Sequence, residues 1–266
     1  MIEQLLSLLG RGKVYDLAQP YFTGMPHHPV HPPYLYSLAK KHGDYVTVGG
    51  VSSASEAIGL GGHVGTHIDA FCHFSRDGRL QDGTSAADVQ SYGGGLKRLS
   101  VETIAPIFRR GVLLDIAANA GVDELPVDFS VSAERLQSAA ANAEVEVREG
   151  DVVLLRTGWA RLWNDPARYI AEVRGPGPEI AAARWLSERR VFAAGSDTIA
   201  FEKVPARDMP VHVHFLVERG IHILEALNME DLARDRVAEF LFAAIPLKIL
   251  GGTGSPIRPV AIAFPG

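Results

Sequence analysis

Residues 62–74 read Gly-His-Val-Gly-Thr-His-Ile-Asp-Ala-Phe-Cys-His-Phe and bring together His63, His67, Asp69 and His73. These are side chains that bind a divalent cation or move a proton. A single histidine on an apolar face is most often a hydrogen-bonded core residue. Three histidines and one aspartate within eleven residues are harder to explain as packing, because each would need its own polar partner when buried. One cation would satisfy several of them together, so the stretch predicts a metal site.

The spacing also restricts how the backbone can run through this stretch. His63 and His67 are four residues apart and could share one face of a helix. His67 and Asp69 are two residues apart, and such residues diverge by about 200° around a helix, so one regular helix cannot aim all the groups at one point. We therefore expect a strand or loop that delivers His63, a turn at Gly65, and a helix that starts near Thr66 and is capped by its hydroxyl.

The same stretch resembles the motif His-x-Gly-Thr-His-x-Asp-x-Pro-x-His of the cyclase family of metal-dependent hydrolases, which includes bacterial kynurenine formamidases and isatin hydrolases. Phe71 stands where that motif has proline. The resemblance implies a swivelling β/β/α fold, a bound zinc or manganese, and hydrolysis of a small amide, lactam or ester. It also implies that His63, His67 and Asp69 hold the metal and that His73 is the catalytic residue that shuttles a proton to the leaving group.

His212, His214 and Glu225 are candidates for a second half of the site, because the three ligands of the motif leave a divalent cation undercoordinated. In the formamidase branch of the family, a histidine about twelve residues before a glutamate helps to bind a second metal. Twelve residues before Glu225 lies Val213, so a match needs a shift of one residue, which favours His212 over His214. The resemblance thus implies one or two ions, with His212 and Glu225 as a tentative second site. Glu225 could instead be an ion-paired carboxylate at the end of a strand.

Residues 19–36 form a proline-rich loop that also contains His27, His28 and His31. The prolines hold this segment extended, with no periodicity that would make the histidines converge. We therefore favour a role in the substrate pocket over a second metal site, as the resemblance also implies. Elsewhere, Arg156 at the end of an apolar strand could be paired structurally or face the substrate, and Asp197 is expected to tie down a loop.

The composition argues against several classes of partner and location. The chain has 266 residues, 47% of them hydrophobic, and a formal net charge of −5, which gives no reason to expect nucleic acid or an anionic membrane as partner. The single cysteine, Cys72, cannot form an internal disulfide, which fits a reducing cytoplasm. The first residues lack the basic region and cleavage site of a signal peptide, and no run of about twenty apolar residues could span a bilayer. We expect a soluble, cytoplasmic protein.

The pattern of helices and strands favours an α/β fold. Helical segments alternate with apolar strands through the centre of the chain, which predicts a mixed sheet flanked by helices in a single domain over residues 1–266, with the proline- and histidine-rich loop at about 19–36. The expected helices cover residues 2–9, 132–143, 178–190 and 209–218. The expected strands cover residues 14–17, 45–48, 56–60, 111–117, part of 150–159, 191–194, 221–224, 240–250 and 259–264.

The function predicted from these features is that of a metal-dependent hydrolase. A metal-activated water would open or cleave a small amide, lactam or lactone, in the manner of an isatin hydrolase or an arylformamidase. The sequence contains no Gly-x-Ser-x-Gly elbow, which argues against a serine hydrolase. The alternatives are a dienelactone-type lactone hydrolase and a non-catalytic metal- or ligand-binding protein, although structural zinc sites usually use four protein ligands, often cysteines.

The substrate and the assembly are less defined by the sequence. A small, flat, aromatic substrate would suit the aromatic side chains Tyr21, Phe22, Tyr34, Trp159 and Trp163, although these are also ordinary core residues. No substrate-binding residue is assigned. The resemblance and the extended proline-rich loop favour a homodimer or homotetramer.

Overall fold

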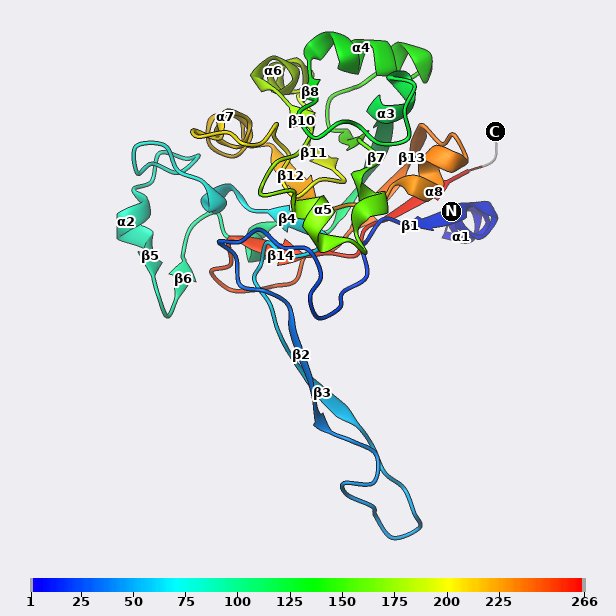
Figure 1. Cartoon of the computed structure of the whole chain (residues 1–266), viewed down its shortest axis with the longest axis vertical. Helices are drawn as coiled ribbons and strands as arrows, with labels where there is room; N and C mark the ends of the chain where they lie inside the picture. The colour runs from blue at the N-terminus through cyan, green and yellow to red at the C-terminus, as the bar shows by residue number, and fades with distance from the viewer. Residues whose placement is uncertain (1, 265–266) are drawn as a thin grey trace.

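The computed structural model describes residues 2–264, which form a mixed α/β domain around one curled, nine-stranded sheet (Figure 1). The strands lie in the order β1-β15-β13-β7-β9-β11-β12-β4-β14. Their bounds, in the same order, are Lys13–Asp16, Val260–Ala263, Glu239–Ala244, Ile107–Asp115, Val152–Arg156, Ala193–Ser196, His222–Glu225, His67–Asp69 and Gly254–Pro256. The central strands β7, β9, β11 and β12 run parallel, and the outer strands pair antiparallel. The expected mixed sheet with flanking helices is therefore confirmed.

The central strand β9 shows why this part of the sheet has two covered faces. All five of its residues are buried. Val153 and Leu155 belong to a core cluster on one face, and Val152 and Leu154 belong to a second cluster on the other. Because side chains alternate along a strand, a continuous run of valine and leucine fills both cores, which is the pattern of a parallel strand covered on both sides.

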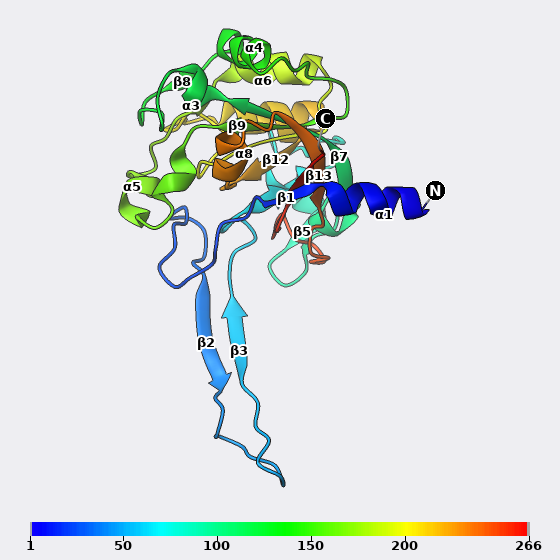
Figure 2. The ribbon, with the colours of Figure 1, turned by 90° about the vertical axis from the view of Figure 1, so that its right-hand side faces the viewer.

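Helices cover the sheet and its edges (Figures 1 and 2). The first core cluster lies beneath α4 (Ala133–Asn142) and α6 (Ile180–Glu188), and the π-helix Val213–Arg219 packs against α6. The α-helices are α1 Ile2–Arg11, α2 Ala86–Val89, α3 Ile116–Asn119, α4 Ala133–Asn142, α5 Pro166–Ile170, α6 Ile180–Glu188, α7 Pro210–His212 and α8 Glu230–Arg234. Short 3-10 helices cover Phe71–His73, Val101–Thr103 and Trp159–Leu162. The helices expected at 2–9, 132–143 and 178–190 are confirmed, whereas 209–218 divides into α7 and the π-helix.

The helix expected to start near Thr66 is wrong, because His67–Asp69 is the strand β4. The hydroxyl of Thr66 does not cap a helix; it donates to the carbonyl of Ala226 and accepts from the backbone N–H of Gln19. The turn expected at Gly65 is present, with φ of +70°. His67 and Asp69 are two residues apart and must face the same point, which one helix does not allow. A strand allows it, since residues two apart in a strand point to the same side of the sheet.

Two expected strands also differ from the structure. Residues 45–48 contain only an isolated bridge between Val46 and Ser52, so their apolar side chains do not belong to the central sheet. The strand expected at 240–250 ends at Ala244, two residues before Pro246. Proline has no backbone N–H to donate to a neighbouring strand, which explains why pairing stops there.

A two-stranded arm projects from the body of the molecule, as both views show (Figures 1 and 2). It consists of β2, Leu35–Lys40, and β3, Ser55–Gly59, which pair antiparallel. Two smaller pairs are β5 Gln90–Ser91 with β6 Gly95–Leu96, and β8 Ser130–Val131 with β10 Gly177–Pro178. Across residues 2–264, none of the helices has the length and apolar character needed to cross a membrane.

Candidate metal centre

The candidate site lies where β4 and β12 pair near one edge of the sheet. In their antiparallel register His67 is opposite Glu225. On the other side of β4, Asp69 is opposite Gly254 of β14. The sheet thus brings together residues that are more than 150 positions apart in the sequence, and the loop before β4 and the helix α7 add His63 and His212.

The first ligand cluster consists of His63, His67 and Asp69, each with one candidate ligand atom within 4.8 Å of the others. All three side chains are buried. His63 Nδ1 lies 2.7 Å from Asp69 Oδ1, and His67 Nε2 lies 3.5 Å from the same oxygen. His67 Nδ1 donates to the carbonyl of Gly65 at 2.8 Å, which leaves its Nε2 as the nitrogen that can bind a metal.

The second ligand cluster consists of Asp69, His212 and Glu225, so Asp69 belongs to both. His212 Nε2 lies 3.1 Å from Glu225 Oε1. His212 Nδ1 donates to Glu202 Oε2 at 2.8 Å, which fixes the orientation of the ring. Glu225 Oε1 also accepts the backbone N–H of Phe201 at 2.7 Å.

Two buried atoms at the centre of these clusters lack a partner. Among residues 2–264, His67 Nε2 and Asp69 Oδ2 are buried side-chain atoms without a hydrogen bond. A buried polar atom without a partner costs about 1–3 kcal/mol, and it is rare in native proteins. Nitrogen and carboxylate oxygen donors of this kind suit zinc or manganese, so the residues present fit a divalent cation.

The electrostatics of the site also favour a cation. Burial alone would raise the pKa of Asp69, but the neighbouring His73, His63 and His67 lower it, so the carboxylate is ionised. Burial likewise opposes ionisation of Glu225, yet its hydrogen bond to His212 and the neighbouring His67, whose Nε2 lies 3.3 Å from Glu225 Oε2, lower its pKa to about 2. For His212, the hydrogen bonds to Glu202 and Glu225 outweigh burial and raise the pKa to about 10. A metal ion bound at His212 Nε2 would take the place of that proton.

His73 lies beside the first ligand cluster and is not a member of either cluster found among the described residues. Its ring stacks on that of His63, with centroids 3.8 Å apart and an interplanar angle of 22°. Burial lowers the pKa of His73 to about 3. The imidazole is therefore neutral near pH 7.

The structure gives Phe71, the departure from the family motif, a local role. Its ring stacks on His222 with centroids 4.1 Å apart and an interplanar angle of 10°. His222 Nδ1 in turn donates to the backbone carbonyl of Asp69 at 2.9 Å. The stacked rings of Phe71 and His222 therefore hold the backbone in place at Asp69. His222 itself belongs to neither ligand cluster.

Several other candidates from the sequence lie elsewhere. His214 contacts Ser187 and Glu218, each at 2.8 Å, and faces α6. Arg156 forms ion pairs with Asp115 at 3.0 Å and Glu230 at 2.7 Å.

Asp197 accepts hydrogen bonds from the backbone and hydroxyl of Thr157 and the backbone of Gly158, so it ties down a loop. The loop of residues 19–36 brings His31 next to the first ligand cluster. Its ring centroid lies 5.2 Å from that of His63 and 6.3 Å from that of His73. Burial lowers the pKa of His31 to about 4.

Sequence reasoning missed Glu202, His222 and Thr253, which support the ligand residues. Thr253 Oγ1 lies 2.8 Å from His63 Nε2. Next to it, a Cβ atom on Gly254 would come 2.5 Å from His63 Cε1, so this glycine makes room for the ring. An acidic residue directly after the apolar run Ile199-Ala200-Phe201 was the available signal for Glu202, since carboxylates are seldom buried without a partner.

The mixed α/β domain carries two buried clusters of histidine and carboxylate side chains near one edge of its sheet. This arrangement is typical of the class of metal-binding enzymes. The family model described as "Putative cyclase" matches residues 15–203, and the chain belongs to this cyclase family. It is a family of metal-dependent hydrolases related to isatin hydrolase and kynurenine formamidase, so the resemblance seen in the sequence is confirmed.

Individual relatives agree with this assignment. The chain is 30% identical to an isatin hydrolase of Roseibium aggregatum over 210 residues, which cover 76% of this chain and 72% of that protein. It is 27% identical to a kynurenine formamidase of Bacillus mycoides, over 92% of this chain and 95% of the relative.

Solved structures give the same result. A crystal structure described as a novel cyclase is 28% identical with a TM-score of 0.88, covering 97% of this chain and 89% of that one. Isatin hydrolase A from Ralstonia solanacearum is 26% identical with a TM-score of 0.76, covering 99% of this chain and 97% of that one.

Proposed function

We propose that this protein is a metal-dependent hydrolase that opens or cleaves the C–N bond of a small cyclic or linear amide. The observation that carries the proposal is the pair of buried ligand clusters that share Asp69, in which His67 Nε2 and Asp69 Oδ2 make no hydrogen bond within the described chain. The relatives named an isatin hydrolase and a kynurenine formamidase support this choice of bond.

In this proposal His63, His67 and Asp69 hold one divalent ion, and Asp69, His212 and Glu225 hold a second. Zinc and manganese both suit these nitrogen and oxygen donors. When bound, such an ion lowers the pKa of a coordinated water from about 15.7 to about 7 and polarises a carbonyl group. The protein fixes the donors for it: Gly65 orients His67, Glu202 orients His212, and Phe201 holds Glu225.

His73 is proposed to move the proton. In hydrolysis the carbonyl carbon gains the oxygen of water, the C–N bond breaks, and the leaving nitrogen takes a proton. A neutral imidazole stacked on His63 is close enough to the ligand clusters to accept a proton from water on one ring nitrogen and to pass it to that leaving nitrogen. Its low pKa, caused by burial, keeps the ring uncharged before the reaction begins.

The proline- and histidine-rich loop is proposed to form a wall of the substrate pocket. His31 reaches His63 and His73 from this loop. Tyr21, at the start of the same loop, packs edge-on against Tyr34, with ring centroids 5.6 Å apart. Aromatic and imidazole rings of this kind suit a flat substrate, because stacked and edge-to-face contacts stabilise such pairs.

The experiment is a substrate panel of isatin, N-formylkynurenine and a dienelactone, assayed on protein whose metal content has been measured. We expect hydrolysis of one of the two amides, loss of activity on chelation with the fold retained, and recovery when zinc or manganese is added. Faster turnover of the lactone would instead identify a lactone hydrolase. A fully metallated protein that hydrolyses none of the three, and that melts when chelated, would refute the proposal in favour of a structural metal site.

A further inference from the structure

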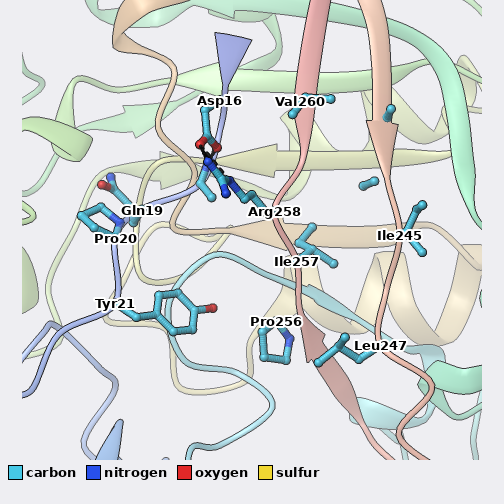
Figure 3. Close-up of a pocket in the computed structure, with 13 residues that line it drawn as sticks. Asp16, Gln19, Pro20, Tyr21, Ile245, Leu247, Pro256, Ile257, Arg258 and Val260 are labelled. Atoms are coloured by element: carbon cyan, nitrogen blue, oxygen red, sulfur yellow. Dashed lines mark hydrogen bonds and ion pairs between the residues drawn. The ribbon is translucent and has the colours of Figure 1, made fainter. Parts of the chain in front are cut away.

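The strand β4, His67–Asp69, carries two residues of the metal centre, and its two ends are held in different ways. At its start, the ring of Tyr21 lies against the turn at Gly65, where a Cβ atom would come 2.3 Å from that ring. The hydroxyl of Tyr21 lies 3.1 Å from the carbonyl oxygens of both Val64 and Thr66. Tyr21 also lines the surface groove shown in Figure 3. The start of β4 is therefore fixed from the proline-rich loop.

The end of β4 is held from the neighbouring strand β12. His222, the first residue of β12, donates from Nδ1 to the backbone carbonyl of Asp69 at 2.9 Å. The same ring stacks on that of Phe71, with centroids 4.1 Å apart. One imidazole thus contacts the chain at positions 69 and 71, on either side of Ala70. These two contacts determine the direction in which the chain leaves the strand.

The imidazole that makes both contacts is buried and uncharged. His222 is 6% exposed, and the ring of Phe192 lies 5.4 Å from it between centroids. Burial lowers the pKa of His222 to about 4, so near pH 7 the ring carries a single proton. That proton is on Nδ1, because Nδ1 donates to a carbonyl. The contact with Phe71 is therefore a stack of two neutral rings, which stabilises the pair beyond the area that it buries.

The backbone at position 71 has the conformation that a proline would impose. Phe71 is the first residue of the 3-10 helix Phe71–His73. Proline is favoured at the first position of a helix, because its φ is preset and its missing N–H would have no partner within the helix. The residue before a proline is usually extended, and Ala70 is extended, with φ of −84° and ψ of 155°. The cyclase motif has proline at this position, whereas this chain has phenylalanine.

We propose that Phe71 and His222 are a pair of positioning residues that hold this backbone by side-chain contact, in place of a proline. Phenylalanine leaves φ free to vary, whereas proline restricts it to about −65°. The stack removes that freedom, because it ties the side chain of residue 71 to a buried ring of β12. The proposal rests on the proposed function only where metal binding is measured.

The pair lies between two groups of the proposed site. Asp69, two residues before Phe71, belongs to both ligand clusters. His73, two residues after it, stacks on His63. A change in the bend between positions 69 and 73 would therefore move the shared carboxylate relative to the ring that is proposed to transfer the proton.

The first test is amide hydrogen exchange of the apoprotein, which needs no metal. The N–H groups of Cys72 and His73 donate to the carbonyls of Leu99 and Ala70, so their exchange rates report opening of the bend. Phe71→Leu removes the stack without presetting φ, and we expect both amides to exchange roughly three- to tenfold faster. We expect Phe71→Pro to keep the wild-type rates.

The second test is a double-mutant cycle with His222→Leu, which removes both the ring and the hydrogen-bond donor. In the wild-type background we expect this substitution to lower metal affinity about tenfold, because groups that orient a ligand residue contribute that much. In the Phe71→Pro background the proline already fixes φ, so the loss should be no more than about threefold. Metal affinity is measured by titrating chelator-treated protein with zinc and with manganese, and the same cycle is repeated on the exchange rates of the apoprotein.

Phe129→Leu is the matched control. Phe129, like Phe71, is a partly buried aromatic residue packed against the first core cluster, and the guanidinium of Arg135 lies 4.3 Å from the centre of its ring. We expect Phe129→Leu to lower the thermal unfolding temperature about as much as Phe71→Leu does. It should keep wild-type metal affinity and wild-type exchange at Cys72 and His73, because it does not contact β4 or β12.

Three outcomes would overturn the proposal. The first is a Phe71→Pro variant that fails to fold, or whose amides exchange as fast as those of Phe71→Leu. The second is a His222→Leu substitution that changes exchange and affinity by the same factor in both backgrounds, which would mean that the two rings act independently. The third is a control that speeds exchange at the same two amides. A wild type that binds no metal would refute the proposed function instead, and the exchange rates of the apoprotein would still decide between the outcomes for the pair.

Discussion

Replacing Glu202 with glutamine removes one carboxylate oxygen from the network that orients His212. Glu202 is 2% exposed and accepts three hydrogen bonds: from the backbone N–H of Val211 at 2.9 Å, from the backbone N–H of His212 at 3.3 Å, and from His212 Nδ1 at 2.8 Å. A glutamine of the same shape has an NH₂ group in place of one oxygen. Whichever way the amide turns, at least one buried N–H group loses its acceptor.

The lost hydrogen bond sets the size of the expected changes in stability and in metal affinity. A buried donor without an acceptor costs about 1–3 kcal/mol, so the apoprotein should be destabilised by this amount. Removing the group that orients a metal-binding histidine typically lowers metal affinity by about 10–100-fold. This corresponds to about 1.4–2.8 kcal/mol of binding free energy. We expect the loss at the second ligand cluster only, because His63 and His67 do not contact Glu202.

The assay is titration of chelator-treated protein with zinc and with manganese, together with thermal unfolding of the apoprotein. Glu218→Gln is the matched control, since Glu218 also accepts from a histidine Nδ1, that of His214, at 2.8 Å, but the pair faces α6. We expect two ions to bind the control with wild-type affinity. The reasoning is refuted if Glu202→Gln keeps the wild-type affinity at both sites, or if the control loses as much.

Three further perturbations test the first ligand cluster and the surface. The His73→Ala variant should keep its metal, but its turnover should fall about 10²–10⁴-fold, because general acid–base catalysis contributes that much. Recovery of activity on adding metal would contradict a proton-transfer role. Gly254→Ala should lower metal occupancy measured by elemental analysis, since its Cβ would come 2.5 Å from His63 Cε1, and unchanged occupancy would show that the ring can move aside. The hydrogen bond from Arg98 lowers the pKa of Asp82 to about 2, so its contribution to stability is present above about pH 4 and is lost as the pH falls towards 2. Asp82→Asn should flatten the stability profile in that window in acid titrations followed by circular dichroism, and an unaltered profile would count against the assignment.

The motif Gly62–Phe74 allowed the first ligand cluster to be predicted because its members are close in sequence. Three histidines and one aspartate within eleven residues are visible without any knowledge of the fold. The backbone that carries them was not visible, since intervals of four residues suggest a helix. The short strand β4 depends instead on pairing with β12 and β14, which lie more than 150 residues further along. Tertiary pairing of this kind overrides local spacing.

The supporting residues were beyond the sequence for a related reason. His222 reaches the carbonyl of Asp69 across 153 positions of the chain, and only the sheet register shows the contact. The position of His212 beside Glu225 also depends on the helix turn of α7 and the π-helix that follows it. The arm was misjudged because Tyr45 to Val48 have the composition of a core strand, whereas the structure places them at the tip of a projecting hairpin.

Asp69 belongs to both ligand clusters, and this gives the site a thermodynamic property that neither cluster has alone. A carboxylate shared by two ligand sets makes the occupancy of one set change the affinity of the other, and this coupling is reciprocal by linkage. In the proposed two-ion site, a first ion would neutralise part of the negative charge that would attract a second. The two ions should therefore load in order, with a stronger first and a weaker second step, so the amount of metal in the surroundings would decide whether the protein works with one ion or two.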